Sequence, residues 1–152
     1  LDVMTVQMIL TECGISVEAF PSEKHFTSWL GLCPNNRKTG GAICSRRTRK
    51  VNNRLATALR VAAYGMSRSQ TAIGAYYRRI RSRVGAPKAI TATARKLACI
   101  IYRMLKYGEE YVERGADYYE QRYKKRIVKN IAKKAKELGF QLLELETGEL
   151  VS

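Results

Sequence analysis

The sequence has no acidic residue over a long central stretch. From Lys24 to Gly108 there is no Asp and no Glu, although the same stretch contains 19 Lys and Arg residues. Globular proteins usually mix charges of both signs, so this pattern predicts that the central body lies against a negatively charged partner. The absence also excludes a metal-dependent phosphoryl-transfer site within this stretch, because such a site needs clustered carboxylates.

Cysteine and histidine are scarce. The chain has four cysteines, none of them two to four residues from another, and one histidine. Structural zinc sites need closely spaced pairs of such residues, so we predict no metal site in this chain and four reduced, mostly packed thiols. The cysteines are Cys13, Cys33, Cys44 and Cys99. We interpret His25, beside Phe26, as a partly buried packing residue.

Long apolar runs are also missing. No stretch approaches roughly 18 apolar residues and no signal peptide is evident, so we predict a cytoplasmic, nucleoid-associated protein that does not contact a membrane. The chain begins at Leu1, inside a segment that already has helical character. We therefore expect it to be a fragment of a longer polypeptide.

The chain is strongly basic, and it has enough hydrophobic residues to fold. The 152 residues include 28 Lys and Arg against 13 Asp and Glu, which gives a net charge of +15, and 45% of the residues are hydrophobic. This apolar content is enough for the core of one domain. A domain this basic binds nucleic acid more often than an anionic membrane surface. If it neutralises about six phosphates, its affinity should fall about a thousandfold between low and moderate salt.

Helical periodicity covers most of the chain. We predict helices over residues 3–13, 23–30, 71–84, 87–107 and 117–138, and a further helix that is capped by Asn52 or Asn53 and reaches Met66. Glycines follow most of these segments and are typical of helix ends. Alternating apolar residues from Phe140 to Val151 predict a short C-terminal β-hairpin.

The predicted fold class is therefore mainly α, a small helical domain with a long basic loop and a short C-terminal hairpin. We expect residues 1–108 to form a basic helical core and residues 109–152 to form a charged helical tail that includes the hairpin.

The segment from Leu32 to Val51 has no periodicity, and loops of this length are often functional. Its glycine pair, Gly40 and Gly41, permits close approach of the backbone to phosphate and can form an anion-binding nest. Six basic side chains in the segment are predicted to contact phosphate oxygens. They are Arg37, Lys38, Arg46, Arg47, Arg49 and Lys50.

Thr39 places a hydroxyl directly before the glycine pair. A hydroxyl in such a loop can attack a phosphodiester if another group activates it. The alternative is that Thr39 only caps a turn in a solvated basic loop.

A second basic region lies on the predicted helix 71–84, where Tyr76 and Tyr77 precede Arg78 and Arg79. With no acidic residue nearby to pair with, we predict that Arg78 and Arg79, together with Arg54, bind nucleic acid. The tyrosines either stack on bases or lie at the rim of the core with their hydroxyls in water.

Acidic residues return only after Gly108. Because basic residues are interspersed with them, we interpret this cluster as a source of ion pairs within a helix and not as a metal site. Its members are Glu109, Glu110, Glu113, Asp117 and Glu120.

Three separated motifs resemble one known family. They are the run Phe20-Pro-Ser-Glu-Lys-His-Phe-Thr-Ser-Trp-Leu-Gly-Leu-Cys-Pro-Asn-Asn, then Arg47-Thr-Arg-Lys-Val-Asn, then Gly115-Ala-Asp-Tyr-Tyr. In this order they closely resemble the C-terminal domain of the insertion-sequence-one-ten family of bacterial transposases, which is related to the Piv invertase. The resemblance covers nearly the whole chain.

The resemblance implies a two-part enzyme. An N-terminal RuvC-like domain would carry four acidic ligands for magnesium, and a C-terminal domain like this chain would contribute a serine nucleophile. Together they would cut and rejoin DNA through a covalent phosphoserine link, guided by RNA in several members. The full-length protein would be a homo-oligomer. This chain itself would hold no cofactor and would bind nucleic acid without cutting it.

By position, the family's serine before the glycine pair corresponds to Thr39. The sequence also has Ala42 where the family has a lysine, and Val51 where the family has a glycine. Ser45 matches another serine of the pattern and is the alternative nucleophile. Our prediction is a nucleic-acid-binding, nucleophile-bearing domain of a transposase; the alternative is a non-catalytic basic DNA- or RNA-binding protein.

Overall fold

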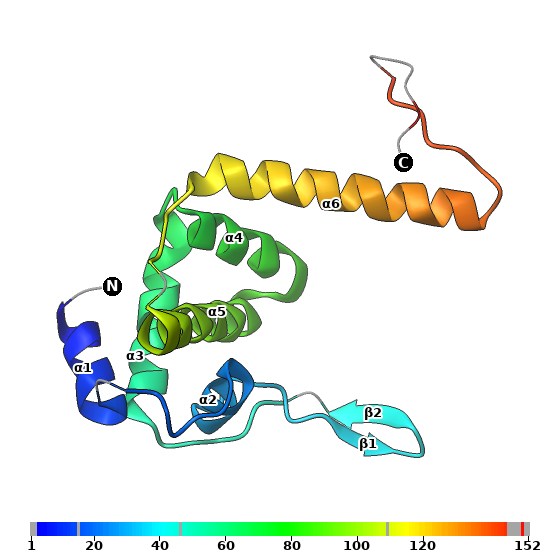
Figure 1. Ribbon diagram of the computed structural model, residues 1–152. Coiled ribbons are helices and arrows are strands. Elements are labelled where there is room, and N and C mark those ends of the chain that lie inside the picture. The colour runs from blue at the N-terminus through cyan, green and yellow to red at the C-terminus, as the bar shows by residue number, and fades with distance from the viewer. Residues whose placement is uncertain (1–2, 15, 46, 109, 146–149, 151–152) are drawn as a thin grey trace.

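The computed structural model describes residues 3–14, 16–45, 47–108, 110–145 and 150. Within these ranges the fold is mainly α, as predicted, with a single two-stranded sheet (Figure 1). The elements are α1 (Val3–Cys13), α2 (Glu23–Trp29), β1 (Arg37–Thr39), β2 (Ala42–Ser45), α3 (Arg54–Gly65), a 3-10 turn η1 (Met66–Arg68), α4 (Ala72–Val84), α5 (Ala86–Tyr107) and α6 (Gly115–Glu137). None of the described helices is long and apolar enough to cross a membrane.

Side-chain caps explain where three helices begin. The oxygen of Asn53 accepts a hydrogen bond from the backbone N–H of Ala56 at 3.0 Å, which identifies Asn53 as the cap of α3. Ser22 caps α2 and Thr71 caps α4 in the same manner. These oxygens satisfy backbone donors that lack partners inside the helix, so the predicted starts are confirmed.

The core lies where α1, α2, α3 and α5 meet. Its buried apolar side chains come from all four helices and from the segment between α1 and α2. They include Ile9, Val17, Phe26, Leu30, Leu55, Leu59, Leu97 and Ile101. The ring of Phe26 packs against Phe20 and Tyr102, and the Tyr102 hydroxyl donates to the Phe20 carbonyl at 2.8 Å. This aromatic cluster joins α2 to α5 just before the basic segment begins.

The predicted unstructured loop contains a β-hairpin. Strands β1 and β2 pair antiparallel, and Gly40 and Gly41 form the turn with φ angles of 56° and 81°. Two-residue turns with positive φ at both positions match the twist of a hairpin, and glycine adopts them without strain. The expectation of a loop without regular structure is therefore wrong for this part of the segment.

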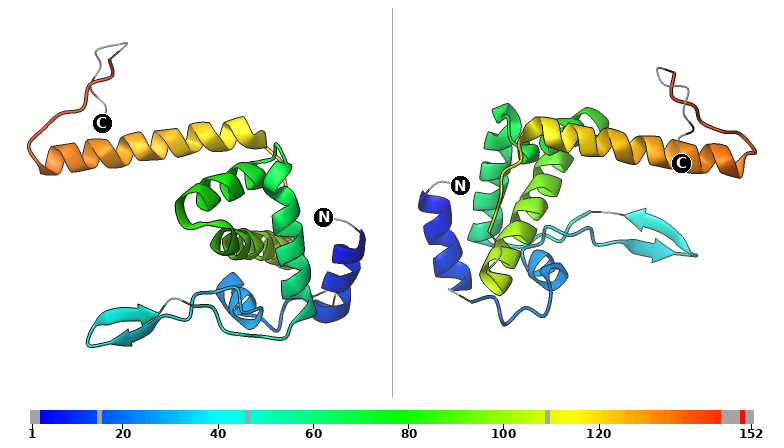
Figure 2. Two further views of the ribbon diagram at one scale, coloured as in Figure 1. Left: turned by 180° about the vertical axis from the view of Figure 1, so that it is seen from behind. Right: turned by 45° about the horizontal axis from the view of Figure 1, so that its top comes forward.

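The hairpin and α6 project from the body toward the same side (Figures 1 and 2). Helix α6 packs against α4 near its start and then extends away. The remaining helices form the body from which both depart. We refer to the hairpin, residues 34–48, and to α6 as the two arms.

The predicted C-terminal hairpin is represented by one isolated antiparallel bridge between Leu143 and Leu150. Residues 146–149, where its turn was expected, lie outside the described residues.

The prediction for His25 was wrong. Its side chain is exposed, and its Nδ1 lies 2.8 Å from the hydroxyl of Ser22. Because Ser22 is the N-cap of α2, the contact is local and closes the first turn of that helix.

Candidate nucleic-acid interface

The hairpin arm is exposed on both faces of its strands. Thr39 pairs with Ala42, Lys38 with Ile43 and Arg37 with Ser45, and one irregularity lies between the last two pairs. Paired residues point to the same face of a ribbon, and positions two apart on a strand share a face. Thr39 and Ala42 therefore share one face of the hairpin, and Lys38 and Ile43 share the other; the irregularity interrupts this alternation before Arg37 and Ser45.

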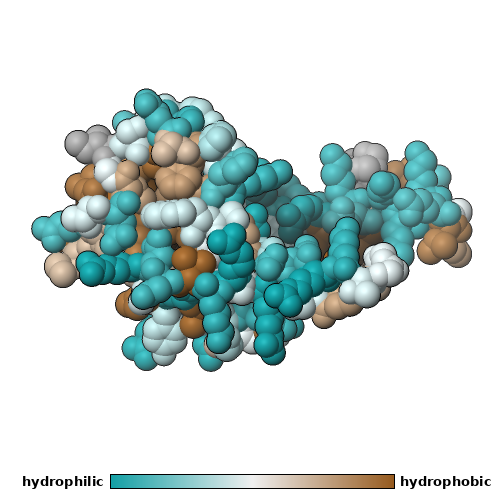
Figure 3. All heavy atoms as spheres, turned by 90° about the horizontal axis from the view of Figure 1, so that it is seen from below, coloured by the Kyte–Doolittle hydropathy of each residue, from teal (hydrophilic) through white to brown (hydrophobic). Residues whose placement is uncertain are grey.

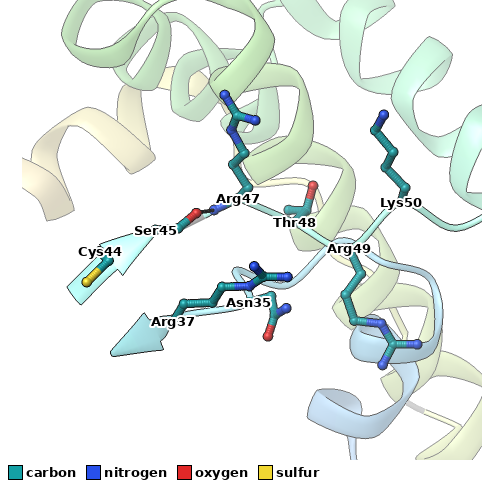
Figure 4. Close-up of a pocket in the computed structure, with 8 residues that line it drawn as sticks. All are labelled: Asn35, Arg37, Cys44, Ser45, Arg47, Thr48, Arg49 and Lys50. Carbon is teal, nitrogen blue, oxygen red and sulfur yellow. Dashed lines mark hydrogen bonds between the residues drawn. The ribbon is translucent and has the colours of Figure 1, made fainter. Parts of the chain in front are cut away.

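A hollow of about 640 Å³ lies beside the base of this arm. Its lining contains no acidic residue, and Arg37, Arg47, Arg49 and Lys50 supply four positive charges (Figure 4). The remaining lining residues are Asn35, Cys44, Ser45 and Thr48. Such a concentration of exposed cations favours a phosphate or another oxyanion as the occupant.

The two candidate hydroxyls occupy different places. Ser45 lines the hollow, and its Oγ accepts a hydrogen bond from the Arg47 N–H at 3.4 Å. Thr39 does not line the hollow; it is exposed beside the glycine turn at the far end of the arm. Lys38, Gly40 and Gly41 are exposed at the same end.

The base of the arm is closed by contacts between its outgoing and returning segments. Pro34 and Thr48 form an antiparallel bridge, and the Asn35 N–H donates to the Arg47 carbonyl at 2.9 Å. Gly31 has a φ of +64°, and a Cβ built on it would lie 2.6 Å from Cγ2 of Val51. Glycine is therefore required at this position both by the backbone conformation and by the close approach of the returning chain.

Arg54 is exposed at the first turn of α3, a few residues after the arm returns to the body. Arg46, also predicted to contact phosphate, lies outside the described residues.

Arg78 and Arg79 have partners inside the protein. Arg78 donates to the carbonyls of Ser69 at 2.6 Å and Ser67 at 3.4 Å, which ties α4 to η1. Arg79 lies over the ring of Tyr123 at 3.9 Å and that of Tyr119 at 5.3 Å, and it donates to the Tyr119 hydroxyl. Their guanidinium groups thus stabilise helix packing, which sequence inspection did not reveal.

The ring of Tyr76 completes the cluster around Arg79, with its centroid 5.8 Å from the guanidinium carbon. A guanidinium stacked on several rings contributes roughly 0.5–2 kcal/mol for each good contact. Since Tyr76 belongs to α4 and the other two rings belong to α6, we call Arg79, Tyr76, Tyr119 and Tyr123 the arginine–tyrosine clamp. It holds the start of the α6 arm on the body.

Glu113 provides a second attachment. One carboxylate oxygen accepts from the N–H groups of Ala72 and Gly115, both at 2.8 Å, and the other accepts from the Tyr111 hydroxyl at 2.5 Å. The same carboxylate therefore caps the start of α4 and of α6. Partial burial raises the pKa of Glu113, but these hydrogen bonds outweigh it and the net pKa is lowered. Glu113 therefore caps two helices, whereas the sequence had suggested that it forms ion pairs within one helix.

The basic character of α6 was overlooked in the sequence. Between Gln121 and Lys136 there are eight Lys and Arg and no acidic residue, and all eight side chains are exposed. They are Arg122, Lys124, Lys125, Arg126, Lys129, Lys133, Lys134 and Lys136. A search for acid-free runs on both sides of Glu109 would have found them. Seen from below, hydrophilic side chains cover much of the body and of the side from which the two arms project (Figure 3).

Other chemistry is limited on the described part of the chain. There, no three His, Cys, Asp or Glu side chains lie together in a way that could hold a metal ion. The four cysteines are free; Cys13, Cys33 and Cys99 are partly buried, and Cys44 on the hairpin is exposed. Burial, with a contribution from Glu12, raises the pKa of Cys13 to about 11, so this thiol stays protonated at neutral pH.

A known protein family matches the first half of the chain. The family model described as the transposase IS116/IS110/IS902 family matches residues 2–78, a range that contains α1, α2, the hairpin arm, α3, η1 and Ala72 to Arg78 of α4. No curated protein and no solved structure matches the chain.

Proposed function

The chain belongs to the transposase IS116/IS110/IS902 family, and on that premise we propose that it is the nucleic-acid-binding, nucleophile-bearing part of a DNA recombinase. Family membership implies interaction with DNA. The observation that carries the finer proposal is the exposed hairpin arm with the four cations around its hollow. We assign phosphate binding to Arg37, Lys38, Arg47, Arg49 and Lys50.

The arm suits a phosphodiester backbone because Arg37, Lys38 and Arg47 are exposed, and no ion pair among the described residues involves them. Of the described residues, none of those lining the hollow is acidic, so a bound phosphate would meet only attraction there. Arginine forks bind phosphate oxygens with two parallel hydrogen bonds, and the glycine turn lets a strand pass close to the backbone. A guide RNA would present the same backbone charge and could use the same surface.

The proposed chemistry is phosphodiester exchange by a hydroxyl on the arm. Attack by Thr39 Oγ on phosphorus would form one P–O bond and break another. The hydroxyl proton would pass to a base, and the leaving sugar oxygen would take up a proton. One bond replaces another of the same kind, so the strand can later be rejoined by the reverse step. Ser45, inside the hollow, is the alternative nucleophile.

The described residues of this chain do not fit a magnesium site, since their carboxylates do not cluster. We propose that the carboxylates and the metal belong to a separate domain, either of the same polypeptide or of a neighbouring subunit in a homo-oligomer. The task of this chain is then to bind the backbone and to present the hydroxyl.

A second candidate function is non-catalytic binding of DNA or RNA. It is favoured by the separation of Thr39 from the hollow, and by a lining that offers no carboxylate or histidine as a general base. Under this function neither hydroxyl would matter beyond its contribution to binding.

The test uses the full-length transposase and labelled element-end DNA. Under the proposal, wild type forms a covalent protein–DNA adduct, Thr39→Ala abolishes it, and Thr39→Ser restores or increases it. Ser45→Ala is the matched control and should retain the adduct while binding DNA normally. Loss of the adduct in Ser45→Ala alone would assign the nucleophile to Ser45. Normal recombination by both alanine variants would establish the non-catalytic function.

A further inference from the structure

We propose that α6 is a second nucleic-acid contact, whose basic stripe binds the sugar–phosphate backbone of a duplex held by the hairpin arm. This inference rests on the proposed function and assigns a part of the molecule that lies outside the residues matched by the family model.

The first argument is charge. Eight Lys and Arg lie between Gln121 and Lys136 with no acidic residue among them. In the part of the chain that the structure describes, the ion pair found joins Arg103 and Glu23, and none involves these eight. Arg126 also lies over the ring of Tyr123 at 5.5 Å, which does not neutralise its charge. Exposed cations without acidic neighbours repel one another, and a polyanionic ligand relieves this repulsion.

The second argument is their arrangement around the helix. At about 100° per residue, six of the eight project within an arc of about 100°. These six form the basic stripe: Arg122, Lys125, Arg126, Lys129, Lys133 and Lys136. Lys124 and Lys134 point elsewhere. The stripe is about 21 Å long, which corresponds to roughly six base-pair steps along a duplex.

The third argument is position. The arginine–tyrosine clamp and the Glu113 cap fix the start of α6 on α4, and the rest of the helix projects to the same side as the hairpin arm (Figures 1 and 2). One ligand can therefore meet both arms. Because the basic side chains already lie on a formed helix, binding also avoids the entropic cost of ordering a flexible tail.

An anionic membrane is the competing partner for a basic helix. Membrane-surface helices use a broad apolar face with aromatic anchors. On α6 the side opposite the stripe carries Ile127, Ile131 and Leu138, which are 36%, 50% and 67% exposed. It carries no Trp or Phe, and Tyr123 at its edge is engaged by Arg79. This narrow apolar side favours nucleic acid.

The experiment compares two double variants of the full chain that have the same composition and the same change of charge. Lys129→Gln with Lys133→Gln removes two cations from the stripe, and Lys124→Gln with Lys134→Gln removes two from elsewhere on the same helix. Binding of a fluorescent 30-base-pair DNA is measured against salt concentration. The stripe variant should bind about tenfold more weakly, and its plot of log affinity against log salt should be shallower by about 1.8. The control variant should keep the wild-type slope.

Equal effects of the two variants, or no effect of either, would overturn the inference. The inference would also fail if the stripe variant kept its affinity for DNA and lost binding only to vesicles of phosphatidylserine and phosphatidylcholine, since the partner would then be a membrane. A hairpin variant, Arg37→Gln with Arg47→Gln, separates this inference from the proposed function. If that variant bound DNA like wild type, the assignment of the hairpin would fail whatever α6 does.

Discussion

The two arms carry similar charge but are built by different means. The hairpin arm takes its shape from backbone conformation, with positive φ at Gly31, Gly40 and Gly41, and its strands bury almost nothing. The α6 arm is attached by side chains, through the arginine–tyrosine clamp and the Glu113 cap. An isolated two-stranded hairpin is marginally stable in water, whereas a long anchored helix keeps its form. The hairpin therefore gains less stability from packing against the body than α6 does.

The largest expected effect tests how the hairpin is attached. Gly31→Ala places a Cβ 2.6 Å from Val51 Cγ2 at a φ of +64°, so it should lower the free energy of unfolding by about 2–4 kcal/mol. Gly14→Ala is the matched control, because Gly14 has a φ of +71° with nothing within 4 Å. It should cost only about 1 kcal/mol. Urea unfolding of both variants measures the difference, and equal losses would show that the close approach to Val51 is unimportant.

A smaller effect tests how α6 is attached. Arg79→Met keeps an unbranched apolar side chain but removes the guanidinium that contacts Tyr119 and Tyr123, so it should weaken attachment of α6 by about 1–2 kcal/mol. Hydrogen exchange of the first turns of α6 should become faster, while that of α3 and α5 stays the same. Arg81→Met, at an exposed position of the same helix, is the control and should change neither. Unchanged exchange in Arg79→Met would mean that the clamp does not hold the arm.

The smallest effect concerns pH. The folded-state pKa of Glu113 is lowered, so its contribution to stability is fully present above the unfolded-state pKa and is lost as the pH falls through the folded-state pKa. Glu113→Gln should therefore destabilise the junction of α4 and α6 at neutral pH. The difference in stability between this variant and wild type should disappear in acid, at pH values below the ordinary pKa range of glutamate. Thermal unfolding from neutral pH down to pH about 3 measures this, and a difference that persists in acid would contradict the cap.

Most of the helical fold could be predicted because its signals are local. Ser22, Asn53 and Thr71 satisfy backbone donors within one turn, and Gly85 and Gly108 end helices through positive φ. Such signals act within a few residues of one another, so a single sequence contains them.

The hairpin was missed because it lacks the usual pattern of a strand. Its strands are three and four residues long and exposed on both faces, so no alternation of apolar and polar residues marks them. The glycine pair was recognised as a turn, but its role in pairing β1 with β2 depends on the geometry of that turn.

The roles of Arg78 and Arg79 could not be predicted because their partners are distant or belong to the backbone. Tyr119 lies 40 residues from Arg79 along the chain, and the contact exists only once α6 packs on α4. The basic stripe of α6 was overlooked for a simpler reason. Asp117, Glu120 and Glu137 at the two ends of the helix made it look like a helix of mixed charge.

The central claim is that both arms bind the phosphate backbone by charge. The most direct measurement is the affinity of the full chain for a duplex of arbitrary sequence over a series of salt concentrations. With six or more phosphates contacted, log affinity should fall against log salt with a slope of about −5 or steeper. A slope near zero, or one that is unchanged when cations are removed from both arms, would contradict the account.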